Sequence, residues 1–413
     1  MLLYSTLITF FAMLVGIIGK PNTGKSTFFN AATLMNVPMA SYPFTTIQPN
    51  YGIAYLRKDC VCKKLNVKDN PVNSICIDGT RLIPVKLVDV AGLVPGASQG
   101  RGLGNKFLDD LRQADALIHV VDASGSTDEE GRVCEAGSHD PLKDVEFVER
   151  EFNLWLKQII LKDWQRIART VEAGADKLTP MLAQRLSGLS IGETVIQVAI
   201  SKLGLKAEKP TLWSEEEIDR FVDYLRKSSK PSLIAANKCD LPTSEKNIER
   251  LKETGRIVIP CAAEAELVLR RAAEKGLIDY IPGDSGFRVK APEKLTLEQK
   301  RALEFIERKV LAKWGSTGVQ QAINAAYFQL LQSVVVYPVE DESKLCDKKG
   351  NVLPDAKVVR KGTTARDLAY LIHTDLGDTF LYAVDAVTGV RLGADHVLED
   401  GQVIKIVAAG KRG

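Results

Sequence analysis

The sequence predicts an α/β fold with a mostly parallel sheet, an inserted α-helical domain and a small C-terminal domain of short strands. Three observations favour this fold class. Short apolar strands are followed at once by polar loops of distinctive composition. One interval between these loops is far longer than a βαβ unit of about 30 residues requires. From residue 334 onward, the pattern changes to short strands separated by turns.

The composition is that of a folded protein without a strong charge imbalance. Of 413 residues, 45% are hydrophobic and 26% are charged, and the formal net charge is +3. A largely disordered chain is therefore excluded, and any surface for nucleic acid has to be a local basic patch. Seven cysteines are too few for a disulfide scaffold and odd in number, so we expect reduced thiols and a cytoplasmic location.

The first 19 residues carry no charge, which raises the question of a membrane helix or a secretory signal. Neither is expected, because no basic segment precedes the apolar run. Its last part, residues 14–18, leads directly into a phosphate loop and is needed as the strand before that loop. Met13 stands just ahead of this strand. We therefore expect residues 1–12 to be an extension, and no membrane association.

Residues 19–26 have the sequence GKPNTGKS, a complete G-x-x-x-x-G-K-S phosphate loop. Its glycines allow consecutive backbone N–H groups to surround phosphate oxygens at a helix N-terminus. Lys25 offers a positive charge to the β- and γ-phosphates, and Ser26 offers a hydroxyl to Mg²⁺. We expect the phosphates to be bound by Gly19, Asn22, Thr23, Gly24, Lys25, Ser26 and Thr27.

A second motif, DVAG at residues 89–92, follows the apolar strand 85–88. Asp89 at the strand end is placed to reach Mg²⁺, and the Gly92 N–H is placed to meet the γ-phosphate. Between the two motifs lies SYPFTT at residues 41–46. A nucleotide switch needs a threonine that binds Mg²⁺ only while the γ-phosphate is present, and we favour Thr46 over Thr45. The alternative is a Ser/Thr-rich loop without that role. The predicted Mg²⁺ ligands are Ser26, Thr46 and Asp89.

A third motif, NKCD at residues 237–240, follows the apolar strand 232–236. Guanine presents N1–H and N2–H₂ side by side, a donor pair that the Asp240 carboxylate accepts and that adenine lacks. The wrong base would leave buried polar groups unpaired, which gives the selectivity. We expect the base to be bound by Asn237, Lys238 and Asp240, with backbone N–H groups of Cys261, Ala262 and Ala263 near guanine O6.

With these motifs, the segment DVAGLVPGA at 89–97 and GRGLGNKFL at 100–108 closely resemble the YchF branch of the Obg-like GTPases, archaeal type. YPFTT at 42–46 resembles the second motif of the same group. The resemblance implies a P-loop GTPase core and covers the C-terminal domain as well. The best-known YchF members carry N-x-x-E at the base-reading motif and are thought to use ATP. This chain has N-K-x-D, so we expect GTP and GDP.

Leu93 occupies the position where Ras-like GTPases carry the glutamine that orients the attacking water. Leucine cannot hydrogen-bond water, and the resemblance implies a class with a hydrophobic residue turned away from the nucleotide. We expect the catalytic contributions to come from Mg²⁺ and from Lys25, Thr46, Gly92 and Asn22. In related potassium-dependent GTPases an Asn at the place of Asn22 helps to hold K⁺, so K⁺ is a further candidate cofactor. The alternative is that Asn22 only shapes the loop.

The motifs also divide the chain into domains. We expect the GTP-binding domain at 13–126 and 231–290, the α-helical insertion at 127–230, a helical connector at 291–333 and the C-terminal domain at 334–413. Asp140 and Pro141 are typical of a helix start and precede an amphipathic pattern. Residues 295–331 are expected to form one helical stretch.

The C-terminal segment, with GTTARDLA at 362–369 and HVLEDGQVIKI at 396–406, resembles a TGS domain, a small β-grasp module. In that family it is regarded as an RNA or ribosome contact, which makes the ribosome or ribosomal RNA the expected partner of a monomeric protein. The local basic candidates are Lys348, Lys349, Arg360, Lys361, Lys411 and Arg412. The alternative is that these residues form an ordinary solvated surface.

Cys60, Cys62 and Cys76 lie close together in the sequence before the strand that leads to Asp89. With Asp69 or Asp78 as a fourth ligand they could bind Zn²⁺, but a fourth Cys or His is not nearby. We therefore favour ordinary thiols over a metal site. His119, inside the strand 117–121, is expected to be a buried structural histidine.

The sequence as a whole predicts a GTP-binding protein that hydrolyses GTP slowly and acts as a nucleotide-dependent switch on the ribosome. Two alternatives stay open. One is an ATP-hydrolysing protein similar to the N-x-x-E relatives. The other is a nucleotide-gated RNA-binding module with little turnover.

Overall fold

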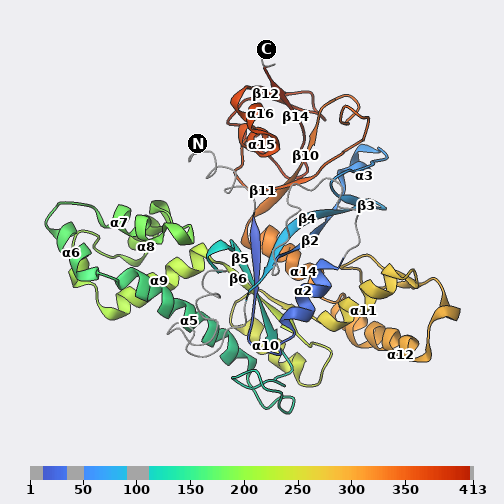
Figure 1. Cartoon of the computed structure of the whole chain (residues 1–413), viewed down its shortest axis with the longest axis horizontal. Helices are drawn as coiled ribbons and strands as arrows, with labels where there is room; N and C mark the ends of the chain where they lie inside the picture. The colour runs from blue at the N-terminus through green and yellow to red at the C-terminus, as the bar shows by residue number, and fades with distance from the viewer. Residues whose placement is uncertain (1–12, 35–50, 91–110, 410–413) are drawn as a thin grey trace.

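The computed structural model describes residues 13–34, 51–90 and 111–409 (Figure 1). The predictions for residues 1–12, Thr45, Thr46, Gly92 and Leu93 lie outside these ranges, as do the tail residues Lys411 and Arg412. Among the described residues, no helix combines the length and the apolar character that crossing a membrane requires.

A mostly parallel sheet forms the centre of the molecule, as predicted, with strand order β2-β4-β1-β5-β6-β7 and β3 added beside β4. β1 pairs in parallel with β4 and β5, and β6 pairs in parallel with β5 and β7, whereas β2 and β3 run antiparallel to β4. β1 and β5 are buried along their whole length, which is typical of parallel strands covered on both faces. The bounds are β1 Leu14–Ile18, β2 Tyr51–Asp59, β3 Ile75–Ile77, β4 Thr80–Asp89, β5 Ala116–Asp122, β6 Ser232–Asn237 and β7 Val258–Pro260.

Helices cover both faces of this sheet. On one face, α2 and α14 pack together against the strands, and Ile17, Phe28 and Ile323 share one hydrophobic core. A second core joins Ile248 of α10 and Leu269 of α11 to β6, and α11 also packs against α2. The bounds are α2 Lys25–Thr33, α3 Val61–Leu65, α10 Ser244–Glu253, α11 Ala263–Glu274 and α14 Val319–Ala325.

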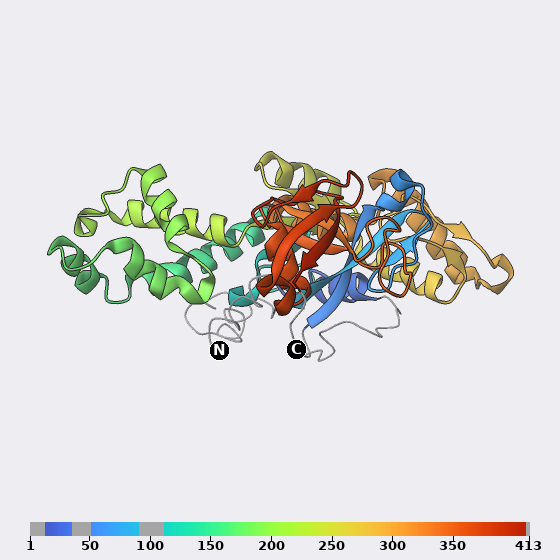
Figure 2. The same ribbon diagram turned by 90° about the horizontal axis from the view of Figure 1, so that it is seen from above.

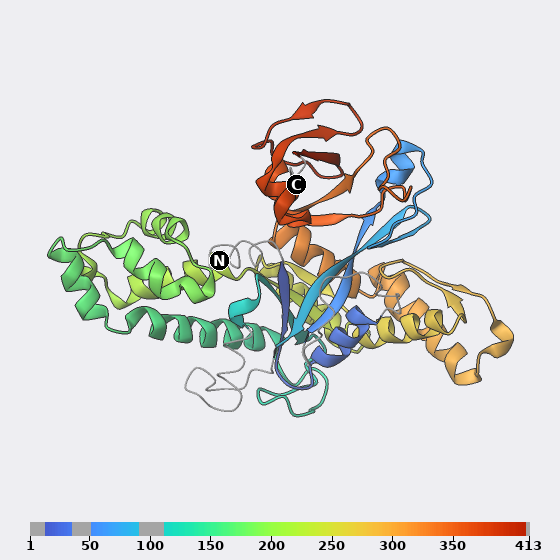
Figure 3. The same cartoon turned by 45° about the horizontal axis from the view of Figure 1, so that its top comes forward.

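The insertion is helical, as predicted, and extends from the sheet as an arm (Figures 1 and 3). Asp140 caps its first helix by accepting a hydrogen bond from the Leu142 N–H, and Pro141 stands at the first helical position. Ser214 and Glu217 form a capping box at the start of the last helix. The helices are α5 Pro141–Leu161, α6 Trp164–Glu172, α7 Leu178–Leu186, α8 Glu193–Leu203 and α9 Glu215–Ser229. Residues 123–140 ahead of α5 contain no helix, and α5 itself packs on β5 as well as on α9.

The single helical stretch expected at 295–331 is wrong, because the structure breaks it. α12 (Leu297–Ile306) continues through a π-helical turn into α13 (Ala312–Trp314). α14 begins only at Val319, as a separate helix. Gly315 and Gly318 both have positive φ at the break. A Cβ on Gly318 would lie 1.8 Å from the Pro260 carbonyl oxygen, so only glycine fits there. A short hairpin of β8 (Ile278–Asp279) and β9 (Arg288–Val289) precedes α12.

The C-terminal part is a five-stranded sheet in the order β11-β10-β14-β12-β13, packed on one side by a helix. β10 and β14 are parallel and the other pairs are antiparallel, an arrangement that agrees with the predicted β-grasp domain. The bounds are β10 Ser333–Val339, β11 Lys357–Arg360, α15 Ala365–Ile372, α16 Thr374–Asp378, β12 Phe380–Asp385, β13 Arg391–Leu392 and β14 Val403–Ala408. This sheet lies above the central one in Figure 1 and in front of it in Figure 2, and Val335 and Tyr337 of β10 are buried in the same core as Ile17.

Candidate nucleotide-binding site

Three of the predicted motifs meet at one edge of the central sheet. β4, β1, β5 and β6 are neighbours, and the three parallel pairings place their carboxyl ends side by side. Asp89 ends β4, the phosphate loop follows β1, and Asn237 ends β6. β1 lies between β4 and β5, and the phosphate loop follows its carboxyl end. Open α/β sheets commonly bind ligands at the carboxyl ends of their strands.

The phosphate loop passes into α2 at Lys25, so the first turn of the helix directs its backbone N–H groups at the loop. Gly24 has φ 90°, and a Cβ there would lie 2.2 Å from Asn237 Nδ2, so a side chain has no room. The ammonium of Lys25 forms an ion pair with Asp89. The charge predicted for the phosphates and the carboxylate predicted for Mg²⁺ are therefore adjacent. Ser26 is exposed and Thr27 is half-buried on the same turn.

Asn237 connects the phosphate loop to the base-binding segments. Its side-chain Nδ2 donates to the Thr23 carbonyl at 2.8 Å, and its Oδ1 accepts from the Ala263 N–H at 3.0 Å. The side chain is buried, and Thr23 itself donates its hydroxyl to the Lys20 carbonyl. One amide thus fixes the distance between the phosphate-binding and base-binding parts of the site.

The turn that presents Asp240 is held from several sides. Cys239 is buried, its N–H donates to the Cys261 carbonyl, and its own carbonyl accepts from Ser244 and from the Trp314 indole. Asp240 follows on this turn and is half-buried. Its backbone position is therefore well fixed, which a base-selecting carboxylate requires.

Lys238 contacts a residue that the motif analysis did not single out. Its φ is 60°, and its ammonium forms an ion pair with Asp122 at 2.8 Å. Burial alone would raise the pKa of Asp122, but hydrogen bonds from Lys238 and Ser124 outweigh that effect and lower the pKa. Asp122 ends β5 at the same sheet edge, and the rule that located Asp89 would also have located it.

The loop at 261–263 differs from the prediction in one respect. The Cys261 N–H donates to the Ala236 carbonyl at 2.9 Å, the Ala262 N–H to the Thr317 carbonyl at 2.9 Å, and the Ala263 N–H to Asn237. All three donors expected near guanine O6 are thus engaged within the protein. To donate to guanine O6, the Ala262 N–H would have to share or give up its hydrogen bond to the Thr317 carbonyl. In the structure, the loop holds Asn237 through the Ala263 N–H.

Asn22 and Lys20 attach the phosphate loop to the segment before α5. Asn22 has φ 62°, and its Nδ2 donates to the Gly131 carbonyl at 2.9 Å. The Lys20 ammonium is buried, donates to the carbonyls of Thr127 and Asp128, and pairs with Asp144 at 2.8 Å. The contact of Asn22 agrees with its loop-shaping alternative. Lys20 and Asp144 were not anticipated, because the phosphate-loop pattern leaves position 20 unspecified.

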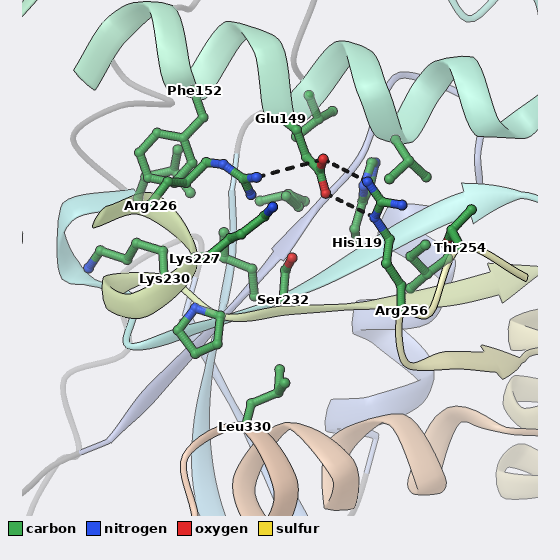
Figure 4. Close-up of a pocket in the computed structure, with 17 residues that line it drawn as sticks. His119, Glu149, Phe152, Arg226, Lys227, Lys230, Ser232, Thr254, Arg256 and Leu330 are labelled. Carbon is green, nitrogen blue, oxygen red and sulfur yellow. Dashed lines mark hydrogen bonds and ion pairs between the residues drawn. The ribbon is translucent and has the colours of Figure 1, made fainter. Parts of the chain in front are cut away.

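A cavity of about 380 Å³ lies between α5 and the strands β5 and β6, and Ser232 at the amino end of β6 lines it (Figure 4). The Glu149 carboxylate forms an ion pair with Arg256 at 2.9 Å and lies 3.7 Å from Arg226. His119 also lines the cavity, and burial lowers its pKa to about 4, so it is a neutral buried histidine, as expected. Among the described residues, none of those predicted to bind nucleotide lines this cavity.

The geometry assigns the chain to the P-loop nucleotide-binding proteins, and comparisons with known proteins refine that class. A model described as 50S ribosome-binding GTPase matches residues 14–150. The G4 motif-containing domain of the YGR210-like Obg-like GTPases matches residues 235–341, and the TGS domain matches residues 349–408.

Relatives match along almost the whole chain. An uncharacterized GTP-binding protein of Methanocaldococcus jannaschii is 52% identical over 96% of this chain and 100% of its own length. The ribosome-binding ATPase YchF of Bacillus subtilis is 30% identical over 95% of this chain and 98% of its own. A crystal structure of a GTP-binding protein from Pyrococcus horikoshii covers 96% of this chain and 100% of its own, with a TM-score of 0.75 and 42% identity. The chain therefore belongs to the Obg-like GTPases of the YchF group, as its motifs predicted.

Proposed function

We propose that this protein binds GTP, hydrolyses it slowly and acts as a nucleotide-dependent switch on the ribosome. The observation that carries the guanine assignment is the Asn237 side chain, which joins the phosphate loop at Thr23 to the turn that ends in Asp240. The turn then presents a carboxylate at a fixed distance from the phosphates. A carboxylate accepts both donors of guanine and is repelled by the acceptor N1 of adenine.

Mg²⁺ fits the donors at the phosphate end of the site. Asp89 offers a carboxylate at a strand end, Ser26 offers a hydroxyl on the first turn of α2, and Thr46 is proposed as the third protein ligand. Mg²⁺, when bound with the nucleotide, neutralises phosphate charge. Lys25, now paired with Asp89, then turns its ammonium to the β- and γ-phosphates, with Gly92 proposed beside the γ-phosphate.

A competition experiment tests the nucleotide assignment. Hydrolysis of labelled GTP is measured with increasing unlabelled GTP, ATP or GDP. We expect GTP and GDP to compete and ATP to compete at least about 10²-fold less well. Equal competition by ATP would instead favour the ATP-hydrolysing alternative, which the name of the Bacillus subtilis relative raises.

The ribosome is proposed as the partner because that relative is named ribosome-binding and because residues 349–408 match the TGS domain. A cytoplasmic monomer is the state that fits this role. Of the basic candidates, Arg360 forms an ion pair with Asp115 and Lys348 with Glu340, whereas Lys349 and Lys361 are exposed. Lys349 and Lys361 are therefore the better residues for testing an RNA contact.

Cosedimentation with ribosomal subunits tests this part. We expect binding with a non-hydrolysable GTP analogue and weaker binding with GDP, and a reduction when Lys349 and Lys361 are both replaced by Ala. Binding that ignores the nucleotide would exclude a switch. Binding that follows the nucleotide without any stimulation of hydrolysis would favour the nucleotide-gated RNA-binding module.

K⁺ is proposed as an additional cofactor through Asn22. The amide nitrogen of Asn22 is used by the Gly131 carbonyl, which leaves its oxygen as the group to contact a cation. Replacing Na⁺ by K⁺ should accelerate GTP hydrolysis in the wild type and not in Asn22→Ala. Equal rates in the two salts would leave Asn22 with its loop-shaping contact alone.

A further inference from the structure

We propose that Cys60, Cys62, Asp69 and Cys76 form a binding site for Zn²⁺ at the end of the central sheet remote from the nucleotide site. Cys60 ends the connection from β2 to α3, Cys62 lies in the first turn of α3, and Cys76 lies on β3. Asp69 comes from the segment between α3 and β3. Four potential ligands from separate elements are thus brought to one place by the fold.

The distances fit a tetrahedral zinc centre. One ligand atom of each of the four residues lies within 4.8 Å of all the others. The sulfurs of Cys62 and Cys76 are 3.8 Å apart, and zinc with Zn–S bonds of about 2.3 Å separates two sulfurs by about 3.8 Å. A disulfide would require about 2.05 Å. All three cysteines are free thiols.

Asp69, rather than Asp78, is the fourth ligand that the structure provides. Its Oδ2 lies 3.2 Å from the Cys60 sulfur and 2.8 Å from Arg81 Nη1. A ligating carboxylate that is also held by a second hydrogen-bond donor is the usual outer-shell arrangement of metal sites. Arg81 therefore fixes the carboxylate that would complete the site.

The charges are compatible with a bound cation. Arg81 is fully buried and always charged, and its ion pair with Asp69 balances its charge. Zinc with three thiolates and one carboxylate carries a net charge of −2, which the guanidinium reduces to −1. Cys60 and Cys62 are buried and Asp69 and Cys76 are half-buried, so most of the site is shielded from water, as in a structural zinc site.

The proposed metal has a definite structural consequence. The Asn70 N–H donates to the Val352 carbonyl, the Val72 N–H to the Pro354 carbonyl, and Arg81 Nη2 to the Leu353 carbonyl at 2.5 Å. The segment that carries Asp69 is therefore docked on residues 352–354, within the C-terminal part of the chain. Zinc would hold this segment in the conformation that makes those contacts.

Metal analysis of the full chain tests the proposal. The protein is produced with added zinc and without a histidine tag, and metals are determined by plasma mass spectrometry. We expect one zinc per chain in the wild type and in the control Cys134→Ser, whose thiol lies near Gly125 far from the cluster. Cys76→Ser should lose the zinc, and Asp69→Cys should retain it, because a fourth thiolate also completes the site.

Cobalt substitution of the wild type keeps the test decisive if Cys76→Ser does not fold. Co²⁺ in a thiolate site gives an intense thiolate-to-cobalt charge-transfer band and tetrahedral d–d bands, which zinc then removes. Their appearance with one equivalent of Co²⁺ supports the site. Zinc-free protein from zinc-rich medium, or a wild type without these bands, would overturn it.

Discussion

The two ends of the central sheet each contain a buried cation, but its surroundings differ. At the nucleotide end, Lys20 pairs with Asp144 and donates to two carbonyls, so its three protons all have acceptors. At the opposite end, Arg81 pairs with Asp69 and the Leu353 carbonyl, and its Nε is buried without a hydrogen-bond partner. Three thiols surround that aspartate.

The difference shows how a buried cation with a purely structural role can be distinguished from one beside a ligand-binding site. Each proton of the Lys20 ammonium has an acceptor, and the group joins the phosphate loop to residues 127–128 and to Asp144 of α5. Around Arg81 there are more potential anions than one guanidinium can use, and their ligand atoms converge. The first arrangement stabilises a site whose ligand binds elsewhere, and the second leaves a place for a cation.

Removing the buried charge of Lys20 should give the largest effect. Lys20→Met leaves the buried Asp144 carboxylate with His139 in place of its cation partner, and we expect the free energy of unfolding to fall by about 3–5 kcal/mol. Urea denaturation measures it. The matched control is Lys348→Met, which breaks an exposed ion pair with Glu340 and should cost less than about 1 kcal/mol. Equal losses of stability in the two variants would contradict the structural role of Lys20.

Lys25→Ala comes next. The other lysine of the loop, Lys20, is buried against Asp144, so the loss of the Lys25 charge should lower GTP turnover by at least about 10²–10³-fold. Single-turnover hydrolysis measures the effect. Lys157→Ala, in the helical arm, should hydrolyse GTP at the wild-type rate. Full activity of the Lys25 variant would remove the phosphate-loop assignment.

Asp240→Asn tests the base-reading end of the same site. The new amide can place a donor against a donor of guanine, so the preference for GTP over ATP should fall by about 1–3 kcal/mol. Equilibrium binding of both nucleotides gives this ratio. Asp219→Asn, exposed on α9, should leave it unchanged. A variant with wild-type discrimination would mean that another group reads the base.

The smallest effect is expected at Leu93. If its side chain is outside the path of the attacking water, Leu93→Ala should change GTP hydrolysis by less than about tenfold, a barrier change of about 1.4 kcal/mol. Loss of a positioned catalytic group typically costs about 10²–10⁴-fold. Turnover in K⁺ measures it, and a collapse of activity would show that Leu93 carries part of the catalysis.

The parts that the sequence predicts well are those with fixed spacing. The places of the phosphate loop after β1 and of Asp89 and Asn237 at the ends of β4 and β6 agree with the sequence, because strand ends and loop glycines leave strong local patterns. Contacts between segments far apart in the chain leave no such local pattern in the sequence. The bond from Ala262 to Thr317 and the choice of Asp69 over Asp78 depend on the packing of elements far apart in the chain. The glycines at the helix break, Gly315 and Gly318, are present in the sequence. The apolar pattern continues across them, and for that reason one helical stretch was expected.

The central claim is that the end of β6 selects guanine, and calorimetric titration of the wild type with GDP and with ADP in the presence of Mg²⁺ tests it most directly. The account predicts one tight site for GDP and at least about 10²-fold weaker binding of ADP. Comparable affinities for the two nucleotides would contradict it.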